Sequence, residues 1–140
     1  PTDCSVPFDL LKKIKNKIKN VDFIVNFAIR TDVNRNIRNA ILFPETHQNV
    51  LKKYSSFLGS NTFFTNQTVI NAATQGKQMD LRALFRKEYM NSLKKLGYNH
   101  FDFKQIENYY DLVFASSHPK GIEFWNKANA IGFDGQRSLF

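Results

Sequence analysis

Residues 109–121, with the sequence YYDLVFASSHPKG, constrain the fold of this chain more than any other segment. The apolar run 112–115 contains Val and Phe and lies between turn-forming residues, which predicts a strand buried on both faces. The SSHPKG end then turns the backbone toward a predicted helix at 122–130. Open α/β sheets commonly bind ligands where a strand ends before a helix, so the end of this strand is a first candidate site. The side chains that the helix is expected to bury against the sheet are Phe124 and Trp125 or Ile131.

A second strand is predicted at residues 21–29 (VDFIVNFAI), which are nearly continuous in Val, Ile and Phe. Before it, residues 8–20 predict an amphipathic helix with a lysine-rich outer face. A helix, a strand and further helix in succession are typical of a parallel α/β sheet. The apolar positions of the first helix are Leu10, Leu11, Ile14 and Ile18.

A third strand, at residues 101–106, is predicted from the alternation of Phe101 and Phe103. Glu107 and Asn108 provide a turn, so this strand should form an antiparallel hairpin with residues 110–116. The fold class expected for the chain is therefore α/β, with one parallel strand and an antiparallel C-terminal hairpin.

A helical insertion is predicted between these strands, over about residues 33–97. Such a connection is far longer than the usual two to six residues, and it indicates a helical block or lid within a single domain, 1–140. Thr31 or Asp32 is expected to cap the first of its helices. The predicted helices are 33–42, 45–57, 66–75 and 80–96, with Gly59, Gly76 and Gly97 after the last three.

The composition points toward anionic partners. The net charge is +8, from 20 Lys and Arg against 12 Asp and Glu, and such an excess attracts polyanions, nucleic acid above all. Solvated lysines are the alternative interpretation. One cysteine fits a reducing cytosol, and no apolar run approaches the roughly 18 residues that a membrane span needs. A chain that opens on Pro1 is expected to be processed, trimmed or part of a longer protein.

No catalytic motif is strongly encoded. His47, His100 and His118 lack the spacing of a metal site, and no glycine-rich nucleotide fingerprint occurs. Two polar strand ends remain as candidates, and they would lie at opposite ends of the sheet if one strand runs antiparallel. The first comprises Asn26, Arg30 and Asp32, followed by Arg35 and Arg38, which are either contacts for an anionic ligand or ordinary surface arginines. The second comprises Ser116, Ser117, His118 and Lys120.

Several segments together carry a resemblance to a known family. They are PTDCSVPFDLL at the start of the chain, VDFIVNFAIRTDVNRNI, and YYDLVFASSHPKGIEFW after the helical block. In this combination the chain resembles the C-terminal part of the three-Cys-motif partner (TcmP) proteins, which look like relatives of class I, Rossmann-like methyltransferases. The resemblance implies that residues 21–28 are the fifth strand of such a sheet and that residues 101–116 are its closing hairpin.

The resemblance also implies site residues and a cofactor. Thr2, Asp3 and Cys4 would follow the fourth strand and lie in the catalytic loop that binds the target. Independently of the resemblance, the two polar strand ends and the helix after the first of them give the expected substrate contacts, which are Arg30, Asp32, Arg35, Arg38, His118 and Lys120. The half that would bind S-adenosylmethionine is absent, so this cofactor is expected only if that half is present, and the chain is otherwise a fragment or a scaffold. The fifth strand would then have an uncovered edge, which a second copy or the missing half should cover.

Three functions follow as expectations. The chain is the C-terminal portion of a methyltransferase-like enzyme that acts on nucleic acid, a non-catalytic module that partners a three-cysteine-motif protein, or a basic nucleic-acid-binding domain. Residues 1–4 become the preferred candidate site, because an antiparallel closing strand makes SSHPKG a structural turn. His118 and Lys120 remain as secondary candidates.

Overall fold

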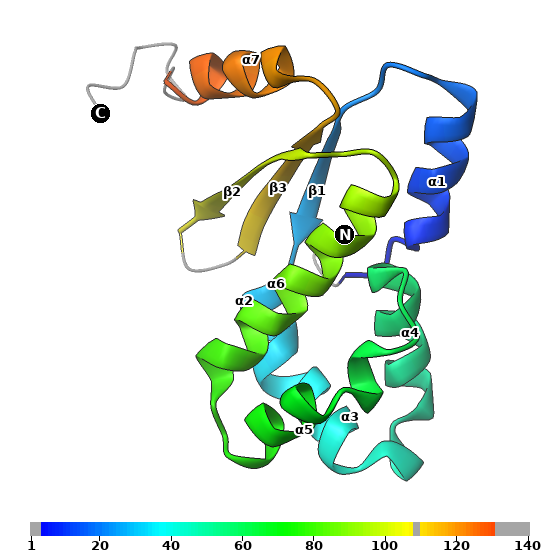
Figure 1. Ribbon diagram of the computed structural model, residues 1–140. Coiled ribbons are helices and arrows are strands. Elements are labelled where there is room, and N and C mark those ends of the chain that lie inside the picture. Colours follow the sequence, from blue (N-terminus) through cyan, green and yellow to red (C-terminus); the bar gives the residue numbers. More distant parts are fainter. Residues whose placement is uncertain (1–3, 108–109, 131–140) are drawn as a thin grey trace.

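The computed structural model describes residues 4–107 and 110–130, and it gives the backbone alone for residues 31–34. A short first helix and a strand are followed by a series of helices, a β-hairpin and a last helix (Figure 1). The elements are α1 (Phe8–Lys17), β1 (Phe23–Phe27), α2 (Ile29–Asp32), η1 (Val33–Ile37), α3 (Arg38–Leu42), η2 (Pro44–Thr46), α4 (Gln48–Leu58), η3 (Phe63–Thr65), α5 (Gln67–Thr74), α6 (Gln78–Lys95), β2 (His100–Ile106), β3 (Tyr110–Ser116) and α7 (Pro119–Asn129).

The three described strands form one sheet in the order β1-β3-β2. The predicted hairpin of β2 and β3 is confirmed, with Phe103 opposite Val113. β1 also pairs with β3 antiparallel, with Phe27 opposite Asp111. The helix and strand succession predicted parallel pairing, but in this sheet β1 and β2 run in the same direction with β3 between them. Both observed pairings are therefore antiparallel, and β3 is central.

Helices cover the two faces of the sheet. On one face Phe23 contacts Tyr98, which follows α6, and Phe103 lies beneath Arg86 of α6. On the other face α7 packs through Trp125, whose ring stacks on Phe114 at 4.9 Å between centroids. Trp125 thus packs against the sheet as expected, although it is half-buried. The expected burial of Phe124 is wrong, because this side chain is 67% exposed, and Ile131 lies outside the described residues.

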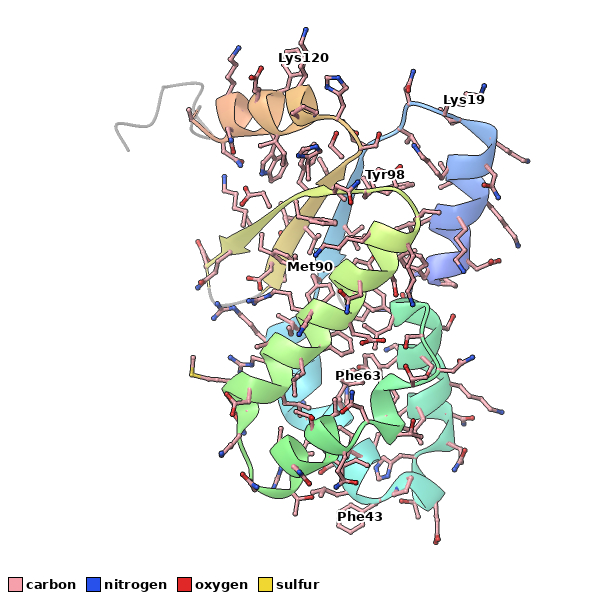
Figure 2. The ribbon with its side chains drawn as sticks, in the orientation of Figure 1. Lys19, Phe43, Phe63, Met90, Tyr98 and Lys120 are labelled. Carbon is pink, nitrogen blue, oxygen red and sulfur yellow. The ribbon has the colours of Figure 1, made fainter. Side chains whose placement is uncertain are left out.

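The core lies where the end of β1 enters the helical part of the chain. Phe27 contacts Phe57 of α4 and both Phe85 and Tyr89 of α6, with centroid distances of 5.3 to 5.5 Å. These rings are all at most 1% exposed. Figure 2 shows Phe63 within the same helical part. Aromatic side chains bury large areas, so this cluster fixes the helices α4 and α6 to the end of the sheet.

Glycines end the helices of the block where they were predicted to do so. Gly59, Gly76 and Gly97 follow α4, α5 and α6 with positive φ values of 63°, 69° and 105°. The start of the block differs from the prediction, because α2 begins at Ile29 and places Thr31 and Asp32 within the helical backbone. These two residues therefore do not cap a helix that begins at residue 33.

The inward face of the first helix agrees only in part with the prediction. Phe8 and Leu11 are buried, whereas Leu10 is 47% exposed and Ile18, just beyond α1, is 53% exposed. Lys15 lies over the Tyr98 ring at 5.0 Å, and its stem covers apolar surface as lysine commonly does. No helix of the described residues is long and apolar enough to cross a membrane.

Candidate functional site

A cavity of about 440 Å³ lies at the end of the sheet where β1 and β2 finish and β3 begins. It opens between this end of the sheet, α2 and α6, which meet on that side of the molecule (Figure 1). Its lining side chains are Ile29, Arg30, Met79, Arg82, Ala83, Arg86, Phe103, Gln105 and Asp111. We call it the three-arginine pocket, after Arg30, Arg82 and Arg86.

The sequence brings the three arginines together by local rules. Arg30 follows the buried residues Ala28 and Ile29, at the point where β1 passes directly into α2. Arg82 and Arg86 are one helical turn apart on α6, so they share a face of that helix. The buried face of α6 is provided by Leu81, Phe85, Tyr89 and Leu93.

Asp111 anchors the pocket from the sheet. Its side chain is 4% exposed and lies at the start of the central strand β3. Arg86 donates a hydrogen bond from Nη2 to Asp111 Oδ2 at 3.1 Å, and Arg30 Nε lies 3.7 Å from Asp111 Oδ1. The Arg86 guanidinium also lies over the Phe103 ring, 5.0 Å from its centroid. A buried carboxylate needs such partners, so Asp111 orients two of the three arginines.

Arg82 has no ion pair or hydrogen bond within the described part of the chain. The Nε atoms of Arg30, Arg82 and Arg86 are all buried without a hydrogen-bond partner there. Three guanidinium groups and one carboxylate line the cavity, so its described lining carries surplus positive charge. A concave site with surplus guanidinium groups binds anions, and the planar donor fork of arginine suits phosphate and carboxylate in particular.

The structure places the residues predicted near the first strand end at different sites. Arg30 lines the three-arginine pocket. Arg38 donates from Nε to the backbone carbonyl oxygen of Ala73 at 3.1 Å and thereby joins α3 to α5. Arg35 is exposed on η1, and the backbone of Asp32 lies in α2.

His118 and Lys120 lie at the opposite end of the sheet, because β3 runs antiparallel to β1. Figure 2 shows Lys120 there, on α7. His118 caps α7, since its Nδ1 accepts a hydrogen bond from the backbone N–H of Lys120 at 3.1 Å. Buried Ser116 donates to the carbonyl oxygen of His118 and accepts from its N–H, at 2.9 and 3.1 Å. The SSHPKG segment is a hydrogen-bonded turn that starts a helix.

The N-terminal candidates are described only in part. Cys4 is 3% exposed and packs in the main hydrophobic cluster, whereas Thr2 and Asp3 lie outside the described residues. A reactive cysteine needs access to solvent and an electropositive neighbourhood. The catalytic role of these three residues stays a prediction. Within the described ranges, no group of three or more His, Cys, Asp or Glu side chains is arranged to hold a metal ion.

The sequence interpretation missed Arg82, Arg86 and Asp111. Two signals were available for them. The first is the four-residue spacing of two arginines within the helical pattern LRALFR, which puts like charges on one face. The second is an aspartate within a strand predicted to be buried, because such a carboxylate requires a cationic partner. Neither signal identifies the partner, which lies far away in the sequence.

Comparison with protein-family models, curated proteins and solved structures finds no match for this chain.

Proposed function

We propose that the chain binds nucleic acid and holds a phosphate group in the three-arginine pocket. The observation that carries this proposal is that Arg30, Arg82 and Arg86 line one cavity, in which Asp111 is the single lining carboxylate and pairs with Arg30 and Arg86 alone. Phosphate is one of the two anions that the arginine fork matches, and it is the repeating group of nucleic acids. The net charge of +8 supports the same class of partner, because a basic protein attracts polyanions over long distances.

The proposal is tested by the fluorescence anisotropy of a labelled single-stranded oligonucleotide at several salt concentrations. Binding that depends on phosphate weakens steeply as salt rises from about 50 to about 200 mM, because counterions are released. Arg82→Gln should weaken binding and lower the salt slope, whereas a flat salt dependence contradicts phosphate-driven binding.

A matched arginine variant separates the pocket from general charge. Arg35 is exposed on η1 and does not line the pocket. Arg35→Gln removes the same charge as Arg82→Gln, so general electrostatic attraction predicts equal losses for the two variants. Binding in the pocket predicts the larger loss for Arg82→Gln, and equal losses would count against it.

A second proposal is that the chain forms the C-terminal portion of a methyltransferase-like three-Cys-motif partner protein. It is favoured by the helical block between β1 and the β2–β3 hairpin, which is the succession that the resemblance implies. A partner with a three-cysteine motif would then bind it. Failure of such a partner to co-purify with the chain would argue against this proposal.

The described residues do not fit S-adenosylmethionine by themselves. This cofactor requires a glycine-rich turn after a strand, and the described glycines Gly59, Gly76 and Gly97 instead end helices. Gly121 lies in α7, where a side chain would clash with Ser116. Calorimetry with a longer chain that adds an N-terminal cofactor-binding half tests the enzymatic proposal, which is excluded if S-adenosylmethionine produces no binding heat.

A further inference from the structure

We infer that the three-arginine pocket is a site for a phosphate monoester, the dianionic group found at the end of a nucleic-acid strand and on free nucleotides. The inference rests on the proposed function for its choice of nucleic acid as the source. It adds that the pocket recognises the terminal phosphate of a nucleic-acid strand, whereas the general proposal requires only a phosphate of the nucleic-acid backbone.

Charge is the first argument. Three guanidinium groups and one carboxylate line the cavity, which leaves two positive charges without a counter-charge among the described lining residues. A phosphate monoester carries about −1.5 to −2 at pH 7, whereas an internal phosphodiester carries a single negative charge. The monoester therefore matches the surplus, and the diester neutralises only part of it.

Shape is the second argument. The cavity has a volume of about 440 Å³ and is bounded by the end of the sheet and by two helices, α2 and α6. Such a volume lies in the range of small-ligand pockets, about 300–1,000 Å³. A terminal phosphate enters a pocket of this kind with one attached sugar. An internal phosphate would have to bring chain on both sides, which suits an open groove better.

Preorganisation is the third argument. Arg86 is held by its hydrogen bond to Asp111 and by the Phe103 ring, and Arg30 lies beside the same carboxylate. Two donor forks are thus positioned before a ligand arrives, which lowers the entropic cost of binding. Arg82 is the third cation and lacks a counter-ion among the described side chains. It lies one turn from Arg86, and such like-charge pairs on a helix repel each other. A bound dianion relieves this repulsion, so it should stabilise the fold.

The experiment compares single-stranded oligonucleotides of one sequence that carry a 5′-phosphate, a 3′-phosphate or no terminal phosphate. At least one phosphorylated form should bind about tenfold tighter than the unphosphorylated one, which corresponds to one additional charge-assisted hydrogen bond. Arg82→Gln should abolish this preference. Arg82→Lys keeps the charge but lacks the fork, so it should restore only part of the preference. Lys95→Gln is the control, because Lys95 is exposed at the other end of α6 and outside the pocket.

A second measurement separates the sources of the phosphate. Inorganic phosphate and a nucleoside 5′-monophosphate are titrated into the protein, and binding is followed by calorimetry and by the increase in Tm. If these small ligands bind through Arg82 while no oligonucleotide binds, the monoester site stands and the proposed nucleic-acid function fails. If all oligonucleotides bind equally, with or without Arg82, and the small ligands do not bind, the monoester inference is overturned while nucleic-acid binding stands. A circular dichroism melt of each variant verifies that it is folded.

Discussion

Asp111 is the residue on which the three-arginine pocket depends structurally. Asp111→Asn removes the charge that Arg86 and Arg30 face, from a side chain that is 4% exposed. Hydrogen bonds to charged groups contribute about 1.5–3 kcal/mol, and the two arginines are partly exposed. We therefore expect the free energy of unfolding to fall by about 1–3 kcal/mol. Urea denaturation measures this change.

The same substitution at an exposed ion pair is the control for Asp111. Asp9 pairs with Lys13 at 3.2 Å on α1, but both side chains are more than 60% exposed, at 67% and 72%. Exposed pairs of this kind contribute little, so Asp9→Asn should leave the urea midpoint nearly unchanged. An equal loss in the two variants would show that general charge balance, and not the pocket, is responsible.

The raised pKa of Tyr98 predicts that the folded protein loses stability in alkali. Burial, together with the nearby Asp22 charge, raises the pKa of Tyr98 to about 12 from its ordinary value of 10.0. Between these two pH values the unfolded chain has lost the proton that the folded chain keeps. The free energy of unfolding should therefore fall as pH rises, by up to about 1.4 kcal/mol per pH unit for this group, and the contribution is fully retained below pH 10.

The variant Tyr98→Phe tests this pH dependence. It also loses the hydrogen bond that the hydroxyl donates to the Val21 carbonyl oxygen at 2.5 Å, so its stability should be lower at every pH. The diagnostic quantity is the slope against pH, which should be shallower in the variant above pH 10. Part of the slope should remain, because burial also raises the pKa of Tyr89. An unchanged slope contradicts the assignment to Tyr98.

At the scale of the elements, two helix ends offer a matched comparison. Gly59 and Gly76 both have left-handed backbones, with φ of 63° and 69°. A Cβ at Gly59 would lie 2.7 Å from the Phe8 ring, whereas at Gly76 the nearest atom is Arg38 Nη2 at 3.9 Å. Both Ala variants are strained, but Gly59→Ala also overpacks the contact between α1 and α4. We expect it to cost about 1–3 kcal/mol more than Gly76→Ala in thermal or urea unfolding. Equal costs would mean that Phe8 moves aside freely.

The sequence predicted those elements whose signals are local. The hairpin, the central strand and the helix-ending glycines all follow from short patterns, because turn residues and buried apolar runs act within a few positions. The inward face of α1 followed only in part, since Leu10 and Leu11 are both apolar and only tertiary packing decides that Leu11 is buried and Leu10 is not. The three-arginine pocket did not follow either, because Arg30, Arg86 and Asp111 meet only when β1 and α6 both pack against β3.

At the scale of the whole molecule, β1 lies at an edge of the described sheet. It pairs with β3 along one side, and its Ile24 side chain is 60% exposed. An apolar edge strand presents unpaired backbone groups that promote association with another strand. We therefore expect a second copy of the chain, or a preceding segment of a longer protein, to cover this edge.

Ile24→Lys tests whether the edge drives self-association. Lysine on an edge strand opposes pairing with another chain, so this variant should shift sedimentation velocity profiles from dimer toward monomer at micromolar concentration. Phe43→Lys is the control, because Phe43 is also 60% exposed but lies at the far end of the molecule from α7 (Figure 2). It should leave the profile unchanged. A wild-type chain that sediments as a monodisperse monomer, with amides of β1 that exchange freely, would contradict a covered edge. A monomer with protected β1 amides contradicts the dimer alone, because some other contact must then protect that strand.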